Sequence, residues 1–92
     1  MVWKLEIDKK ADKLYRKLDP QSKQRITKFL NKNLIECDNP RAIGKPLTGS
    51  FSGKWRYRVD DYRILCTLND AEKIITITKI AHRRKAYFSI LF

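Results

Sequence analysis

Hydrophobic and polar positions alternate at the start of the chain and then change to a helical period. In residues 2–7, Trp3, Leu5 and Ile7 share one side of an extended backbone, which predicts a short strand. Residues 8–36 instead place apolar side chains three and four positions apart, as an amphipathic helix does. These positions are Ala11, Leu14, Tyr15 and Leu18, and then Ile26, Phe29, Leu30 and Leu34.

Two aspartates mark where these helices begin. Asp8 precedes the first apolar face, and Asp19 is followed by Pro20, a residue favoured at the first helical position. We therefore expect two helices joined by a tight connection, with Lys23, Lys28 and Lys32 on the outer side of the second.

The second half of the chain has the pattern of a meander of strands. Residues 38–53 contain two prolines and all three glycines, so we expect a connection there, with one helical turn around 41–43. Three strand-like runs follow at 54–59, 62–68 and 73–80, with separations short enough for antiparallel hairpins.

We expect the last segment, 82–92, to form a short helix. The order β-α-α-β-β-β-α predicts a single α+β domain over residues 1–92. In it, the N-terminal strand and the helical hairpin pack on one face of a small antiparallel sheet, and the other face stays open to bind a ligand.

Charge narrows the class of partner. The chain has 21 Lys and Arg against 10 Asp and Glu, a formal net charge of +11. Residues 1–40 carry ten basic and six acidic groups, a net +4, and residues 41–92 carry eleven and four, a net +7. This balance favours nucleic acid, an anionic membrane or an acidic protein as partner, and directs attention to the second half.

Several classes of protein do not fit the sequence. No apolar run approaches the roughly 18 residues of a membrane span, and the N-terminus lacks the apolar stretch of a signal peptide. Cys37 and Cys66 lie far apart and match no metal-ligand spacing. We therefore expect a cytoplasmic protein with reduced thiols, no metal site and no cofactor.

A cluster of arginines is the first candidate site. In residues 54–59, Lys54, Arg56 and Arg58 point to one side of the strand. If the two aspartates at 60–61 form the turn, Arg58 lies directly opposite Arg63, and like charges at that separation destabilise a sheet. The arrangement suits an anion site, since guanidinium groups grip phosphate oxygens in pairs. A solvated polar face, or neutralisation by the turn aspartates, is the alternative.

A second basic cluster follows the last strand. It comprises His82, Arg83, Arg84 and Lys85, with Tyr87 close behind. Cations beside an aromatic ring suit single-stranded nucleic acid, whose phosphates bind Arg and whose bases stack. The alternatives are a solubilising tail, a tyrosine in the core and a histidine with a purely structural role.

Taken in order, these segments resemble the RelE/ParE superfamily of toxins over nearly the whole chain. The matching motifs are KLDP (17–20), KPLTG (45–49), WRYRV (55–59), DYRIL (61–65) and HRRKAY (82–87). The last is similar to the ending H-R-x-x-x-Y that is common in RelE-like members.

The resemblance implies an activity. RelE-type toxins are ribosome-dependent, metal-independent endoribonucleases that cut mRNA in the A site, where a 2′-hydroxyl attacks the neighbouring phosphate. It implies that Arg56 and Arg58 are the two basic strand positions and that Arg63 grips phosphate. It implies also that Arg83 is the general acid and that Tyr87 stacks on a base. Supporting contacts to RNA would come from Lys54, His82, Arg84 and Lys85.

One position departs from the RelE pattern. Arg56 stands where the candidate general base of RelE is a lysine, and arginine stays protonated at neutral pH. His82 has a suitable ordinary pKa near 6.5, and Lys54 lies on the same face as Arg56. The base therefore stays unassigned, and the proton would pass to the ribosome, to His82 or to water.

Two other functions fit the same resemblance. One is a ParE-type inhibitor of DNA gyrase without a nuclease site, and the other is an inactive RNA-binding scaffold. Each toxin interpretation implies a cognate antitoxin, with the toxin monomeric alone and hetero-oligomeric with the antitoxin. The nuclease interpretation adds the ribosome and mRNA. The apolar tail at 88–92 would pack on the core or join the antitoxin interface.

Overall fold

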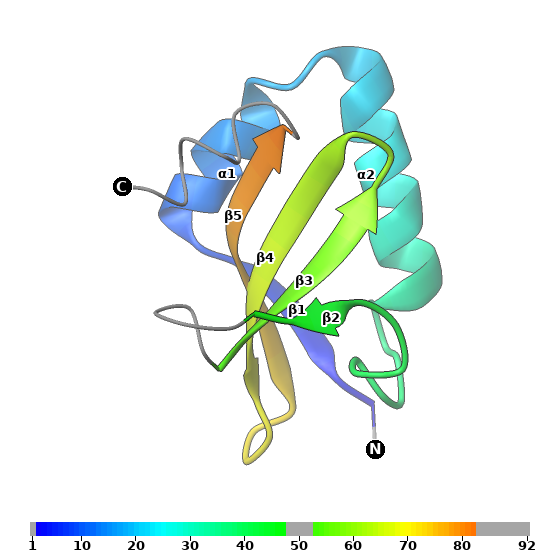
Figure 1. The fold of residues 1–92 in the computed structure, drawn as a ribbon, viewed down its shortest axis with the longest axis vertical. Coiled ribbons are helices and arrows are strands. Elements are labelled where there is room, and N and C mark those ends of the chain that lie inside the picture. The colour runs from blue at the N-terminus through cyan, green and yellow to red at the C-terminus, as the bar shows by residue number, and fades with distance from the viewer. Residues whose placement is uncertain (1, 48–52, 83–92) are drawn as a thin grey trace.

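The computed structural model describes residues 2–47 and 53–82, which form two helices and a five-stranded sheet. The strands lie in the order β1-β5-β4-β3-β2 (Figure 1). The elements are β1 (Lys4–Ile7), α1 (Lys9–Arg16), α2 (Pro20–Asn33), β2 (Lys45–Pro46), β3 (Lys54–Val59), β4 (Tyr62–Asn69) and β5 (Ile74–His82). The α+β arrangement predicted from the sequence is confirmed.

The sheet is mixed, whereas the sequence predicted an antiparallel one. β2 to β5 pair antiparallel, but β1 lies parallel to β5, with Lys4 opposite Ile74 and Ile7 opposite Ile77. Parallel neighbours need a long connection between them. Here both helices and three strands separate β1 from β5 along the chain, so the sequence pattern of β1 carried no sign of its direction.

The connection between α2 and β3 also differs from expectation. The helical turn predicted around 41–43 is wrong, and a two-residue strand, β2, follows instead. Side chains satisfy this backbone from outside: Asn39 Oδ1 accepts from Arg41 N at 3.0 Å, and the Ile43 carbonyl accepts from Trp55 Nε1 at 2.8 Å. A local side chain, Asn39, and a side chain of β3, Trp55, therefore hydrogen-bond this stretch.

The last predicted strand is longer than its pattern indicated. β5 continues to His82, so the predicted final helix does not begin at that residue. The rest of that predicted helix, 83–92, lies outside the described residues.

Both predicted helix caps are confirmed. Asp8 Oδ1 accepts from Ala11 N at 2.8 Å, and Asp19 Oδ2 accepts from Ser22 N at 3.0 Å, with Pro20 at the first position. Hydrogen bonds from the Ser22 hydroxyl and N–H lower the pKa of the Asp19 carboxyl. The two caps place the helices one after the other along the same side of the sheet.

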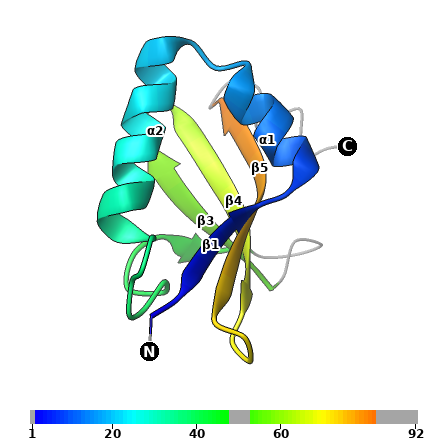
Figure 2. The ribbon, with the colours of Figure 1, turned by 180° about the vertical axis from the view of Figure 1, so that it is seen from behind.

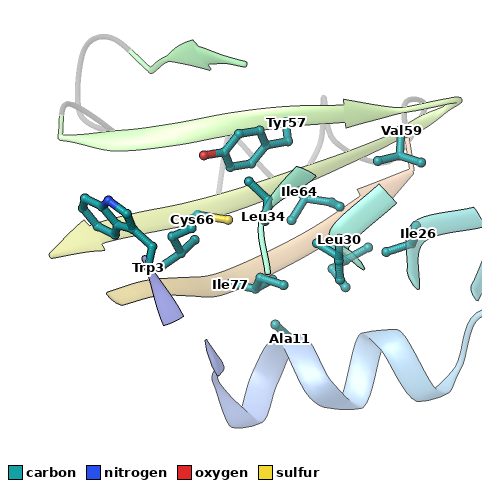
Figure 3. Packing of buried hydrophobic residues seen from close by; sticks show 12 residues of the cluster. Trp3, Ala11, Ile26, Leu30, Leu34, Tyr57, Val59, Ile64, Cys66 and Ile77 are labelled. Carbon is teal, nitrogen blue, oxygen red and sulfur yellow. The ribbon is translucent and has the colours of Figure 1, made fainter. Parts of the chain in front are cut away.

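The helices cover one face of the sheet. α1 packs along β5 and α2 along β3, as the view from behind shows (Figure 2). The core lies between the helices and the sheet. It includes Ile26 of α2 and Leu34 at the end of that helix, together with Tyr57 and Cys66 of the sheet (Figure 3). Burial raises the pKa of the Cys66 thiol to about 12. None of the described helices is long and apolar enough to cross a membrane.

Candidate nucleic-acid interface

The sheet face opposite the helices, which we call the open face, collects basic side chains. Strand alternation points Tyr57 and Val59 into the core, so the side chains between and before them project the other way. The residues of the open face are Lys54, Arg56 and Arg58 of β3, Arg63, Leu65 and Thr67 of β4, Lys79 and Ala81 of β5, and Lys45 of β2.

The hairpin between β3 and β4 opposes two arginines. Val59 pairs with Tyr62 around the turn at 60–61, and Arg58 pairs directly with Arg63, as the sequence predicted. The backbone of Asp60 has φ of 52°, a left-handed conformation that aspartate tolerates better than most residues. The tight turn therefore fixes the register that brings the two guanidinium groups together.

The turn aspartates do not form ion pairs with this cluster. Asp60 Oδ2 accepts from Nη1 of Arg25 on α2 at 3.1 Å, on the helical side. Over residues 2–47 and 53–82, no ion pair involves Arg56, Arg58 or Arg63. Asp60 therefore pairs with Arg25 and does not neutralise the arginines of the open face, which was the alternative left open by the sequence.

Mutual repulsion is visible in the electrostatics of Arg56. Burial, followed by the charges of Arg63 and Arg58, lowers the pKa of the Arg56 guanidinium. The ordinary pKa of arginine is so high that the group still stays protonated at neutral pH. Arg56 therefore acts as a fixed, partly desolvated cation, which interacts strongly with an anion.

His82 lies on the other side of the sheet from these arginines. It pairs with Tyr62, and the two rings meet edge-on, with centroids 5.2 Å apart and planes at 90°. With Ser22 and Arg25 it lines a hollow of about 240 Å³ beside the start of α2. The structure therefore does not bring His82 to Arg58 and Arg63.

The other predicted site residues divide into two groups. Lys54 lies on the open face, opposite Thr67 and one step along from Arg56. Arg83, Arg84, Lys85 and Tyr87 lie outside the described residues.

The open face also contains two lysines that were not predicted from the sequence as site residues. Lys45 lies opposite Arg56, and Lys79 lies opposite Leu65. β2 has only two residues, so it shows no alternation of polar and apolar positions that would have placed Lys45. In β5, a register shift beside Leu65 and Cys66 breaks the simple alternation that would have placed Lys79.

A small hollow of about 80 Å³ adjoins the opposed pair, lined by Arg58, Arg63, Tyr62 and the two turn aspartates. In the part of the chain that the structure describes, no group of three or more His, Cys, Asp or Glu side chains is placed to hold a metal ion. Guanidinium groups placed next to one another in this way can hold an anion by charge-assisted hydrogen bonds.

Comparison with solved structures finds this fold among toxins. The chain superposes with a TM-score of 0.80 on the RelBE2 toxin–antitoxin complex of Mycobacterium tuberculosis, at 24% identity over 90% of this chain and 93% of that one. For the archaeal RelE–RelB complex of Pyrococcus horikoshii the TM-score is 0.67, at 27% identity over 90% and 97%.

A third match is a free arginine-to-alanine double variant of Escherichia coli RelE, with a TM-score of 0.74 and 21% identity over 97% and 93% of the two chains. No curated protein sequence matches the chain. The family model for the ParE toxin of type II toxin–antitoxin systems, parDE, matches residues 2–87. The chain therefore belongs to the ParE toxin family, within the RelE/ParE superfamily of type II toxin–antitoxin systems.

Proposed function

We propose that the protein is a toxin that stops translation by cutting mRNA in the ribosomal A site. The observation that carries this proposal is the arginine cluster of the open face, with Arg58 opposite Arg63 and Arg56 beside them. Within residues 2–47 and 53–82, these arginines form no ion pair. Such a cluster does not stabilise the fold, because like charges on neighbouring strands repel each other. It would stabilise the dianionic transition state of a phosphodiester cleavage.

The chemistry is a displacement at phosphorus. The 2′-oxygen forms a bond to phosphorus, the bond to the 5′-oxygen breaks, and a cyclic phosphate and a 5′-hydroxyl result. Negative charge grows on the non-bridging oxygens, where Arg58 and Arg63 are assigned to hold it, each contributing a few kcal/mol, roughly. Arg56 holds the adjoining phosphate.

The two protons of the reaction are assigned to groups beyond the open face. Arg83 gives a proton to the departing 5′-oxygen, and Tyr87 stacks on a base, both by the resemblance to RelE. His82 lies on the helical side and Arg56 stays protonated, which favours the ribosome or water as acceptor of the 2′-hydroxyl proton. No metal ion takes part in this scheme.

The partners follow from the same proposal. The Mycobacterium and Pyrococcus structures that match this chain are complexes with antitoxins, so we assign this toxin a cognate antitoxin that covers its basic surface. The toxin alone is assigned as a monomer, and together with its antitoxin it forms a hetero-oligomer. Its place of action is the cytoplasm, where ribosomes and mRNA are found.

Expression in a bacterial host tests the assignment. Wild-type protein should arrest growth, and Arg63→Ala, Arg58→Ala and Arg83→Ala should each relieve the arrest. Arg16→Ala removes an exposed charge from α1 and should leave the arrest unchanged. Full toxicity of Arg58→Ala and Arg63→Ala would overturn the site assignment.

Inhibition of DNA gyrase is the second candidate, because the matching family model is that of ParE. Primer extension on a translated message separates the two. Breaks within codons support the nuclease, whereas intact mRNA together with blocked replication supports gyrase inhibition.

A further inference from the structure

A hollow of about 380 Å³ opens at the outer edge of β3, between the second half of α2 and the chain leading into β2. It is separate from the small hollow beside Arg63. On the outer edge of β3, β2 pairs only with Trp55 and Arg56. Among the described residues, no strand pairs with Arg58 on that edge, which is therefore open there. The hollow is therefore continuous with the arginine cluster through Arg56 and Arg58.

The inner wall of the hollow is aromatic and held in place. Phe29 of α2 is half-buried, and its ring is tilted by 54° against the buried ring of Tyr57, with centroids 6.1 Å apart. The Tyr57 hydroxyl donates to the Pro40 carbonyl at 2.6 Å. Trp55 Nε1 donates to the Ile43 carbonyl and so fixes the opposite wall. The wall is thus formed before any ligand arrives.

The rim of the hollow is cationic. Lys45, Arg56 and Arg58 border it, and no acidic side chain does so among the described residues. Asn33 supplies a neutral polar group: its Nδ2 donates to the Phe29 carbonyl at 3.1 Å, which leaves Oδ1 and the second N–H for a ligand. An aromatic wall, an amide and three cations together match a nucleotide, whose base is flat and whose phosphate is anionic.

We propose that this hollow binds one base of the single-stranded RNA held on the open face, with the base against Phe29 and its phosphate between Arg56 and Arg58. The choice of RNA as ligand rests on the proposed function. The hollow has the size of a small-molecule site and is larger than one base, so volume alone does not orient the base. In this proposal the amide of Asn33 contacts the edge of the base and orients it.

A double-mutant cycle on binding tests this inference without any cleavage. The probe is a fluorescently labelled 2′-O-methyl hexanucleotide, which lacks the attacking hydroxyl, and its affinity is measured by anisotropy. Phe29→Leu should weaken binding by about 5- to 100-fold, the effect of losing one base-stacking contact. Leu14→Ala, which trims an exposed apolar side chain of α1, should bind as wild type does.

Abasic probes then locate the base. If the hollow holds one base, removing that base should make wild type and Phe29→Leu bind alike, at a single position of the probe. Asn33→Ala, which leaves the aromatic wall intact, should weaken binding at that same position only. Additive effects at every position, or no effect of Phe29→Leu in a protein that unfolds cooperatively, would overturn the inference.

This outcome is distinguishable from that of the proposed function. Coupling at one position together with intact mRNA in translating cells would keep the base-binding hollow and reject the nuclease. Cleavage of mRNA together with additive binding effects would support the nuclease and reject the base-binding hollow.

Discussion

Arg58 and Arg63 lie opposite each other on neighbouring strands, and no acidic side chain of the described residues forms an ion pair with either. At this separation like charges weaken a sheet, by a few tenths of a kcal/mol up to about 1 kcal/mol. The pKa of the Arg56 guanidinium is lowered by burial first, and then by the charges of Arg63 and Arg58. The arginine pair therefore lowers the stability of the fold. Such a loss is common at binding sites whose charge is neutralised only by the ligand.

The first prediction concerns this conflict between stability and binding. Arg63→Ala should raise the free energy of unfolding by about 0.5 kcal/mol, because it removes the repulsion, even as it abolishes toxicity. Urea unfolding of the isolated toxin measures the change, with Arg16→Ala as the control that removes a charge from the helical side. A loss of stability above about 1 kcal/mol would show that Arg63 contributes to the fold instead.

A second prediction at this scale concerns Gly44. Its φ is 79°, and an added Cβ would lie 2.4 Å from the Arg56 carbonyl oxygen and 2.7 Å from Trp55 Nε1. Gly44→Ala should therefore cost about 2 kcal/mol or more, and should also disturb the rim of the hollow beside β3.

Gly53→Ala is the matched control for this substitution. Gly53 also has a positive φ, of 92°, but nothing lies within 4 Å of its added Cβ. It should cost only the backbone strain, about 1 kcal/mol. Equal losses for the two variants, measured by thermal unfolding, would refute the steric argument.

At the scale of elements, the segment 38–44 is attached to the sheet at both of its ends. Tyr57 and Trp55 donate to its carbonyls, and Arg41 makes a paired contact with Asp70 in the turn between β4 and β5, at 2.7 and 2.9 Å. These contacts place β2, and with it Lys45, beside Arg56. The position of the cationic rim therefore depends on side chains outside it.

The Arg41–Asp70 contact gives a prediction about pH. Hydrogen bonding from Arg41 lowers the pKa of the Asp70 carboxyl in the folded state. A carboxyl with a lowered folded pKa stabilises the fold above its unfolded pKa, and the gain disappears as the pH falls through the folded value. Asp70→Asn should thus lower the thermal midpoint near pH 7, and this difference should shrink below about pH 4. A difference that stays constant from pH 7 to pH 2 would contradict the argument.

The sequence predicted those elements whose signals are local. Asp8 and Asp19 cap helices through contacts three residues away, and the turn at 60–61 fixes the register of Arg58 against Arg63. Such contacts involve neighbours along the chain, so their pattern is visible without a fold.

The features that the sequence did not predict are settled by distant contacts. The direction of β1 depends on pairing with β5, about seventy residues on by the register of Lys4 with Ile74. The segment 41–43 is held in a non-helical conformation in part by Trp55 of β3, which donates to the Ile43 carbonyl. His82 lies away from the arginines because the bulge between Ile77 and Lys79 shifts the alternation of β5. Ile80 and His82 therefore lie on the core side, which simple alternation from Ile77 did not predict.

At the scale of the molecule, the chain has a formal net charge of +11, and the described residues place basic side chains both on the helical side and on the open face. A hollow of about 900 Å³ lies along the helices, and its lining includes Lys23, Lys28 and Lys32. It has no arginine cluster, and we assign it no part in phosphate chemistry. The open face differs from it in having guanidinium groups at fixed positions on a sheet, whereas the lysines project from the exposed sides of a helix.

Charge on this scale predicts how salt acts on RNA binding. The logarithm of the affinity for a single-stranded oligonucleotide should fall linearly with the logarithm of salt concentration, with a slope near −0.7 for each phosphate contacted. Arg63→Ala should reduce the magnitude of that slope by about 0.7, because one contact is lost. Arg16→Ala should leave the slope unchanged. Anisotropy titrations between low and physiological salt measure both, and an unchanged slope for Arg63→Ala would place the phosphate elsewhere.

We propose that the arginines of the open face cut mRNA on the ribosome. The experiment that decides this adds purified toxin to ribosomes paused on a defined message and then maps the message by primer extension. We expect a break within the A-site codon for wild type and Arg16→Ala, no break for Arg63→Ala, and none on the same RNA without ribosomes. Intact message with wild-type protein, or cleavage by Arg63→Ala at the wild-type rate, would contradict it.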